Sequence, residues 1–247
     1  MKGMILAAGY GVRLRPETDK IPKPLFSIGK TNMIKNSIGF FQRHGVKEIA
    51  INIYHLGHMI KDELDSIPVG SVNIHLIEEK TLMGTAGGIK GAQPFLDGSE
   101  FAVINSDILT NLDLCAAIRF HRKKNALATL VVRENPDPAR IGTLKQDRDE
   151  RLVRFLASRS PEYDASKVSD SLKMFTGVHI FSPEIFKHIP AGRPVGISEE
   201  TYPALIESGA DIFAYDHYGY WADIGTPDSY DAAKLDVAYN RFKPYSI

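Results

Sequence analysis

Residues Leu6 to Leu25, here called the opening stretch, read LAAGYGVRLRPETDKIPKPL and begin at the end of the short apolar run Met4 to Leu6. A buried strand that leads into a glycine-containing loop presents bare backbone N–H groups, which proteins use to hold phosphates. Arg13 and Lys23 add positive charge beside this loop, and a proline on each side of the lysine restricts its backbone. The opening stretch therefore predicts a nucleoside triphosphate site at the end of the first strand.

The chain has 247 residues, of which 43% are hydrophobic, so it can bury a full core. An α/β chain of this length commonly folds as one unit, and we expect a single domain over residues 1–247. Lys and Arg together number 30, as do Asp and Glu. Because this balance produces no overall field that would attract a polyanion, we expect neither nucleic acid nor an anionic membrane as a partner.

The cysteine content and the start of the chain favour a cytoplasmic protein. Cys115 is the only cysteine, which excludes an internal disulfide, and no Asn-x-Ser/Thr glycosylation acceptor occurs. Met1 leads almost directly into the first predicted strand, without the long apolar segment of a signal peptide. No apolar run approaches the length that would span a membrane. We therefore expect a reducing, cytoplasmic location.

Hydrophobic periodicity alternates between strand-like and helix-like segments along most of the chain. The predicted helices are residues 32–44, 59–64, 112–122, 198–207 and 228–239, and the predicted strands are 48–53, 71–77, 101–105, 128–132 and 212–215. Strands and helices in short succession indicate a parallel sheet with right-handed crossovers. From Gly142 onward, strand-like pieces at 143–144, 152–156 and 174–181 predict an antiparallel extension over about residues 142–223. The predicted fold class is α/β, with a Rossmann-like mixed, mostly parallel sheet flanked by helices.

Three other patterns are weaker. Gly9-Tyr10-Gly11 begins a dinucleotide-binding pattern, but the third glycine would have to stand at Leu14. Gly29-Lys30-Thr31 resembles the end of a P-loop, but the first glycine of that motif is missing, so we expect a simple turn. His55 and His58 lack both the HExxH spacing and a third ligand nearby, and we expect them to be surface histidines at a helix start.

Three later clusters carry residues that could complete the site. Residues 83–88, MGTAGG, open a helix with small side chains against which a base or ribose could lie. Asp107 follows the predicted strand 101–105, at the edge where open parallel sheets bind ligands, and Asp223 lies in the run WADIGTP, residues 221–227. Two carboxylates at strand ends would suit Mg²⁺. Each aspartate could equally cap a helix or a turn, and their pairing in space does not follow from the sequence.

The opening stretch resembles the signature LAAGxGxRLxPxTxxxPKPL of the sugar-1-phosphate nucleotidyltransferases. Gly84-Thr85-Ala86-Gly87, Asp107, Phe175-Thr176-Gly177 and the WADIGTP run recur in the family's order, so the resemblance covers nearly the whole chain. It implies a glycosyltransferase-A-like mixed sheet with a small antiparallel sugar-binding extension. This implied fold agrees with the predicted pattern of strands and helices.

The resemblance also implies a role for each matching residue. Arg13 would grip the triphosphate, Lys23 would touch the sugar phosphate and the α-phosphate, and Asp107 and Asp223 would be the Mg²⁺ ligands. The implied nucleotide-binding residues are Leu6, Ala8, Gly9, Gly11, Arg13, Gly84, Thr85, Ala86 and Gly87. The implied sugar-phosphate-binding residues are Lys23, Gly142, Thr176 and Gly177.

Two departures from the family pattern indicate a compact subgroup. Many family members carry Glu-Lys-Pro before the sugar-side strand, whereas residues 156–173 contain no such tripeptide and leave Arg159, Lys167 and Lys173 as candidates for its lysine. No hexapeptide repeat of a C-terminal β-helix occurs. The chain is most similar to the compact subgroup that includes N-acetylmuramate-1-phosphate uridylyltransferases and mannose- or heptose-1-phosphate guanylyltransferases.

The function implied by the resemblance is the synthesis of a nucleotide-sugar and pyrophosphate from a nucleoside triphosphate and a sugar 1-phosphate, with Mg²⁺ as cofactor, for cell-envelope or glycan precursors. The sugar phosphate would attack the α-phosphorus in line with the leaving pyrophosphate. One alternative is a catalytically silent regulatory subunit that binds a nucleotide-sugar, and another is a cytidylyltransferase that acts on a non-sugar phosphate. The sequence leaves open the base, the sugar and the choice between a monomer and a homodimer.

Overall fold

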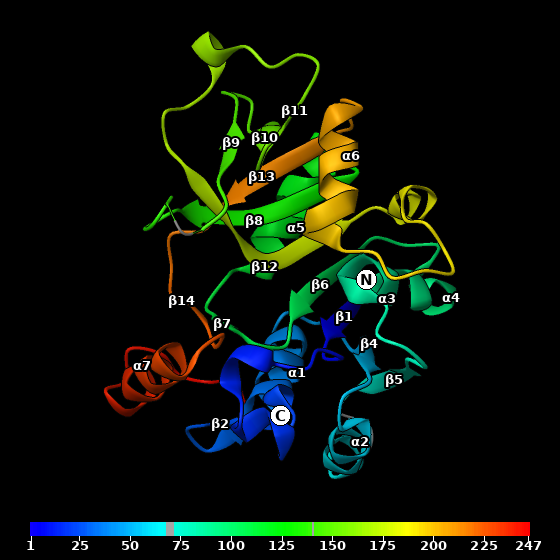
Figure 1. Ribbon diagram of the computed structural model, residues 1–247, viewed down its shortest axis with the longest axis vertical. Helices are drawn as coiled ribbons and strands as arrows, with labels where there is room; N and C mark the ends of the chain where they lie inside the picture. The colour runs from blue at the N-terminus through cyan, green and yellow to red at the C-terminus, as the bar shows by residue number, and fades with distance from the viewer. Residues whose placement is uncertain (68–71, 140) are drawn as a thin grey trace.

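The computed structural model describes residues 1–67, 72–139 and 141–247 (Figure 1). Its main sheet joins strands in the order β11-β10-β9-β12-β6-β1-β4-β5, and β8 and β13 attach to it through a β8–β12 pairing. These strands are β1 (Lys2–Leu6), β4 (Glu48–Ile53), β5 (Asn73–Glu78), β6 (Phe101–Asn105), β8 (Ala128–Glu134), β9 (Leu144–Gln146), β10 (Leu152–Phe155), β11 (Ser158–Arg159), β12 (Lys173–Phe181) and β13 (Ile212–Asp216). Two short pairs, β2 (Ser27–Ile28) with β3 (Thr31–Asn32) and β7 (Ile108–Thr110) with β14 (Trp221–Asp223), lie outside this sheet.

Parallel pairing forms the half of the main sheet that is made by β6, β1, β4 and β5. β1 lies between β4 and β6 and runs parallel to both, and β5 runs parallel to β4. Met4, Ile5 and Ile51 in these strands are fully buried, as expected where helices cover both faces of a parallel sheet. The carboxyl ends of β1, β4 and β6 therefore meet at one edge of the sheet.

Helices cover both faces of the sheet, as predicted. They are α1 (Met33–Arg43), α2 (Gly57–Asp65), α3 (Gly84–Gly91), α4 (Gln93–Leu96), α5 (Leu114–Lys124) and α6 (Tyr202–Glu207), whereas α7 (Pro227–Ala238) packs outside the main sheet, in a third apolar cluster with Phe26 and Ile28. Residues of α3, α4 and α6 pack in one buried apolar cluster with the sheet, and residues of α1, α2 and α5 pack in another. α1 shows how the sequence determines where a helix begins and ends. The Asn32 side chain accepts a hydrogen bond from the Lys35 N–H at its start, and Gly45, at φ 76°, follows its end.

The predicted extension is antiparallel, as expected, but it is continuous with the main sheet. β12 pairs antiparallel with β6 near its carboxyl end, from Val178 to Phe181, and with β9 at its first residue, Lys173. β10 pairs antiparallel with β9 and β11. In Figure 1 β9, β10 and β11 lie at one end of the molecule, and α2 and β5 lie at the opposite end. The register of β12 against β8 breaks between Phe175 and His179, where Gly177 has φ 78°. A glycine is required there because the backbone is left-handed.

Three element predictions differ in detail from the structure. The opening stretch, expected to be a loop, winds into three 3-10 turns at Val12–Leu14, Glu17–Asp19 and Lys23–Leu25. The helix expected at 198–207 begins as a π-helical turn, Ile197–Thr201, because Pro203 has no N–H to donate four residues back. The strand expected at 71–77 is β5, and Ser71 lies outside the described residues.

No described helix combines the length and apolar character needed to cross a lipid bilayer.

Candidate functional site

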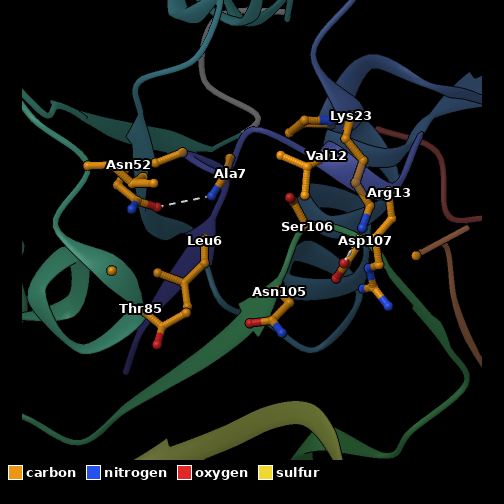
Figure 2. A pocket seen from close by; sticks show the side chains of 17 residues that line it. Leu6, Ala7, Val12, Arg13, Lys23, Asn52, Thr85, Asn105, Ser106 and Asp107 are labelled. Carbon is orange, nitrogen blue, oxygen red and sulfur yellow. Dashed lines mark hydrogen bonds and ion pairs between the residues drawn. The ribbon is translucent and has the colours of Figure 1, made fainter. Parts of the chain in front are cut away.

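A pocket of about 360 Å³ lies at the carboxyl ends of β1, β4 and β6 (Figure 2). In Figure 2 Asn52, Leu6 and Thr85 lie on one side of it, and Lys23, Arg13 and Asp107 lie on the other. The residues that line it are Leu6, Ala7, Ala8, Gly9, Gly11, Val12, Arg13, Lys23, Pro24, Asn52, Leu82, Gly84, Thr85, Asn105, Ser106, Asp107 and Gly225. One end of the pocket is thus lined by apolar side chains and the Asn52 amide, and the other end is lined by charged side chains.

The loop after β1 forms one wall and offers free backbone donors. In the described part of the chain, no carbonyl or side chain accepts a hydrogen bond from the N–H groups of residues 8 to 11. Gly11 has φ 63°, and a Cβ added there would lie 2.9 Å from the Thr18 side chain. Glycine at position 11 therefore allows the loop to turn into its 3-10 segment while N–H groups remain available for an anion.

Two cations stand at the charged end. The Nζ of Lys23 forms an ion pair with Asp107 Oδ2, and the two side chains are 12% and 22% exposed. Arg13 is exposed and lies against the backbone of Gly225, where an added Cβ would be 2.8 Å from Arg13 Nη2. Because residue 225 has no side chain, the Arg13 guanidinium can lie on this side of the pocket.

The structure brings Asp107 and Asp223 together. Asp107 follows β6, and the antiparallel β7–β14 pair places Asp223 opposite Ile108, with the Ile224 N–H donating to the Asp107 carbonyl at 3.0 Å. Burial and then the charge of Asp107 raise the pKa of the Asp223 carboxyl above its usual range, while Lys23 and Arg13 act in the opposite direction. The two carboxylates are therefore close enough for the charge of Asp107 to affect the pKa of Asp223.

One oxygen of each carboxylate fits a metal ion. Oδ1 of Asp107 and Oδ1 of Asp223 are buried, and neither has a hydrogen-bond partner among the described residues. Unpartnered buried carboxylate oxygens are costly, and Mg²⁺ is commonly held by one or two carboxylates together with substrate phosphates. Within residues 1–67, 72–139 and 141–247, no group of three or more His, Cys, Asp or Glu side chains could hold a metal. A metal at this pair would therefore take its remaining ligands from phosphate and water.

The start of α3 forms the opposite wall. Gly84, at φ 71°, and Thr85 line the pocket, and the Thr85 hydroxyl accepts a hydrogen bond from the Ile197 N–H at 2.7 Å. Ala86 and Gly87 do not line it: their N–H groups donate to the Val195 carbonyl at 3.0 and 3.2 Å. The structure thus brings only the first half of the expected GTAG motif to the pocket.

The expected sugar-side residues are more scattered. Gly177 packs against Asn105 of the pocket, where an added Cβ would lie 2.9 Å from Asn105 Nδ2. Thr176 is buried; its hydroxyl donates to the Val131 carbonyl, and its own carbonyl accepts from Trp221 Nε1, both at 2.8 Å. Gly142 lines a separate depression near Leu156. Only Gly177 of these residues therefore adjoins the pocket.

The three candidates for the missing lysine are held away from the pocket lining. Lys173 is buried and lies 2.7 Å from Asp216, Lys167 is paired with Asp164 at 3.4 Å, and Arg159 stacks on Tyr163 in edge strand β11. A cation that the sequence did not single out, Arg133, contacts β14. The Arg133 guanidinium is 5.4 Å from the centre of the Trp221 ring, in the strand that carries Asp223.

Two of the three weaker patterns do not add to this site. Gly29 and Lys30 form the turn between β2 and β3, as expected, and Thr31 begins β3. His58 is exposed, as expected, and His55 is partly exposed just before α2, with its Nε2 2.7 Å from the Thr18 carbonyl. His55 helps to anchor the opening stretch to the end of β4.

Sequence reasoning missed Asn52 and Leu82 as lining residues, whereas Gly225 lies in the WADIGTP run that it had singled out. Leu82 is an ordinary apolar residue before a glycine, and it carries no distinguishing pattern. Asn52 could have been found, because it is the one amide within the apolar run of β4, EIAINI, at the position paired with Leu6. A buried amide in such a strand must find partners, which is a signal in itself.

Comparison with known protein families assigns the chain to one of them. The family model described as Nucleotidyl transferase matches residues 2–240, and the chain belongs to this family. Its fold is similar to that of HddC from Yersinia pseudotuberculosis, with a TM-score of 0.76, 24% identity and coverage of 95% of this chain and 98% of that one. The Rossmann-like mixed sheet expected from the sequence is thereby confirmed.

Among curated proteins, the chain is 32% identical to the UTP–glucose-1-phosphate uridylyltransferase of Synechocystis over 95% of its length. It is also 30% identical to the mannose-1-phosphate guanyltransferase of Yarrowia lipolytica over 93% of its length. These alignments cover 63% and 62% of the two relatives, so the chain spans somewhat less than two thirds of their length.

Proposed function

We propose that the protein transfers a nucleotidyl group from a nucleoside triphosphate to a sugar 1-phosphate and releases pyrophosphate. The observation that carries this proposal is the arrangement of Asp107 and Asp223 beside Arg13 and Lys23 at the end of the pocket. Each carboxylate has a buried oxygen with no hydrogen-bond partner among the described residues, and the loop after β1 has N–H groups without an acceptor there. Such a site can hold several phosphates and a divalent cation together.

The chemistry follows from the charges. A phosphate oxygen of the sugar 1-phosphate forms a bond to the α-phosphorus as the bond to the bridging α–β oxygen breaks, and pyrophosphate leaves with that electron pair. The nucleophile is already anionic, so no general base is needed. Bound Mg²⁺ would supply positive charge to the phosphates. Asp107 and Asp223 would hold it, Arg13 would bind the triphosphate, and Lys23 would reach the attacking phosphate and the α-phosphate.

For the substrates we propose UTP or GTP and a hexose-type sugar 1-phosphate, in the supply of precursors for cell-envelope or other glycans. The uridylyltransferase and guanyltransferase relatives support this choice, and the base pocket does not by itself select between them. We further propose that Gly177 and the strand of Trp221 border the sugar.

A matrix assay tests the proposal. Five nucleoside triphosphates are combined with a panel of hexose, aminosugar and heptose 1-phosphates in MgCl₂, and pyrophosphate release is measured. We expect release with at least one pair. Release only with a non-sugar phosphate such as phosphocholine would favour the cytidylyltransferase alternative, and no release with any pair would favour a catalytically silent subunit.

The two cations give the first mutational prediction. Arg13→Ala and Lys23→Ala should each lower turnover by about 10²–10³, or roughly 3–4 kcal/mol of transition-state stabilisation, because each removes a preorganised charge. Arg15→Ala and Lys20→Ala are matched controls, since both residues are exposed and neither lines the pocket. Near wild-type turnover of Lys23→Ala would contradict the assignment.

A further inference from the structure

Asn52 connects the first wall of the pocket to the neighbouring strand. It lies near the carboxyl end of β4, opposite Leu6 in the parallel register, and is 3% exposed. Its Oδ1 accepts a hydrogen bond from the Ala7 N–H at 3.0 Å, a contact drawn in Figure 2, and its Nδ2 donates to Glu79 Oε1 at 2.7 Å. The side chain therefore continues the sheet's hydrogen bonding one residue beyond the end of β1.

Glu79 carries the connection to the second wall. It follows β5, and its other oxygen, Oε2, accepts a hydrogen bond from the Met83 N–H at 2.8 Å. Met83 directly precedes α3, so the carboxylate sits at a helix N-terminus, where unpaired N–H groups and the helix dipole favour negative charge. A continuous set of hydrogen bonds thus runs from the loop after β1, through Asn52 and Glu79, to Met83 at the start of α3.

α3 also packs directly on this pair. A Cβ added at Gly88 would lie 2.6 Å from Asn52 Nδ2 and 2.9 Å from Glu79 Oε1. The helix can approach so closely only because position 88 has no side chain. The separation between the loop after β1 and the start of α3 is therefore set by the length of the Asn52–Glu79 bridge.

We propose that Asn52 and Glu79 are positioning residues for the nucleoside triphosphate: through the Ala7 and Met83 backbones they fix the spacing of the two pocket walls. The inference deepens the proposed function and rests on it for the ligand of the pocket. It predicts that the bridge controls affinity for the nucleoside triphosphate much more than affinity for the sugar phosphate.

An exchange of donor and acceptor tests the bridge. Asn52→Asp alone places two carboxylates next to each other with no donor between them. Glu79→Gln alone either places two amide NH₂ groups next to each other or leaves the Met83 N–H without its acceptor. In the double variant Asn52→Asp with Glu79→Gln, the glutamine amide can donate to the aspartate while Ala7 and Met83 keep their acceptors. Binding of UTP and GTP in MgCl₂ is measured by calorimetry, and KM is measured for both substrates.

We expect each single variant to weaken nucleoside triphosphate binding about tenfold or more, since each leaves a buried or half-buried hydrogen-bonding group unpaired. The double variant should return to within about threefold of wild type, and KM for the sugar phosphate should change less than KM for the nucleoside triphosphate throughout. Single variants that bind like wild type, or a double variant no better than the weaker single, would overturn the proposal.

The chain contains a matched control pair. Asn32 Nδ2 donates to Glu63 Oε1 at the same 2.7 Å, but this pair joins α1 to α2 and lies outside the pocket. Asn32→Asp and Glu63→Gln should lower the melting temperature without changing nucleotide affinity. If Asn52→Asp does not fold, Glu79→Gln provides the same comparison.

Failure of the inference differs from failure of the proposed function. A wild-type protein that binds UTP or GTP but releases no pyrophosphate contradicts the function and leaves the affinity comparison valid. A wild-type protein that releases pyrophosphate, with variants of unchanged affinity, contradicts only the positioning role. A wild-type protein that binds no nucleoside triphosphate overturns both.

Discussion

At the scale of single residues, the burial of Asp223 beside Asp107 favours cation binding and lowers the stability of the metal-free protein. Its pKa is raised by burial and by Asp107, so the ionised form is disfavoured in the folded protein relative to the unfolded chain. Because the folded pKa lies above the unfolded one, the stability from this group is lost as pH rises through the two values. Above this range the ionised Asp223 therefore destabilises the protein until a cation compensates its charge.

We therefore predict that Asp223→Asn raises the melting temperature of the metal-free protein while it removes activity. For a chain of this size, about 1 kcal/mol corresponds to about 2–4 °C. Thermal unfolding in EDTA, and in MgCl₂ with a nucleoside triphosphate, measures both effects: ligand should stabilise wild type and not the variant. Asp228→Asn is the control, since this exposed carboxylate at the start of α7 favours the helix and its loss should lower stability. A lower melting temperature of metal-free Asp223→Asn would refute the argument.

The site residues differ in how far the sequence could predict them. Asp107 could be expected at a ligand edge, because it follows a recognisable buried strand. Its approach to Asp223 depends on the pairing of β7 with β14, and strands of three residues are too short to show any periodicity. Both candidate metal ligands could therefore be named from the sequence, but their approach to each other follows only from the fold.

At the scale of elements, α3 depends on a segment more than a hundred residues later in the chain. The Val195 carbonyl accepts from the N–H groups of Ala86 and Gly87, and the Val195 N–H donates to the Met83 carbonyl at 2.8 Å. The glycine-rich sequence predicted a helix entry, but it carried no information about this partner. For the same reason it could not show that Ala86 and Gly87 face away from the pocket.

Gly84→Ala tests this dependence. Gly84 has φ 71°, and an added Cβ would lie 2.6 Å from the Val195 carbonyl oxygen, so the variant combines backbone strain with a clash against backbone. Gly98→Ala is the matched control, because Gly98 has φ 84° and no atom within 4 Å of an added Cβ. We expect Gly98→Ala to cost about 1 kcal/mol through strain alone. Gly84→Ala should lower the melting temperature further and weaken nucleoside triphosphate binding, and equal effects of the two variants would contradict this account.

At the scale of the whole molecule, the alternation of strands and helices was sufficient to predict the parallel half of the sheet, because each of these strands is a short apolar run between helical segments. The place of β12 could not be predicted. This strand pairs with β6, β8 and β9, and these contacts join segments that are far apart in the sequence. The extension was therefore expected as an attachment, whereas it is continuous with the core sheet.

Two deeply buried histidines, His179 in β12 and His121 in α5, make the fold sensitive to acid. Burial lowers the pKa of His179 to about 3 and that of His121 to about 4. In the unfolded chain both groups take up a proton near pH 6.5. Between about pH 6.5 and 4 the unfolded state thus binds more protons than the folded state, so stability is fully present above this range and falls as pH falls through it.

His179→Gln measures this contribution. The ring Nδ1 of His179 contacts the Tyr202 hydroxyl inside the core, and a glutamine side chain can also hydrogen-bond there but does not titrate. Removing one differential proton should reduce the slope of the free energy of unfolding against pH by about 1.4 kcal/mol per pH unit between pH 4 and 6. Denaturant unfolding at several pH values gives this slope for wild type, His179→Gln and the exposed control His58→Gln. The control should keep the wild-type slope even if its stability shifts. A wild-type slope in His179→Gln would mean that the buried ring is already protonated in the folded protein, or that its site opens to solvent before the sheet unfolds.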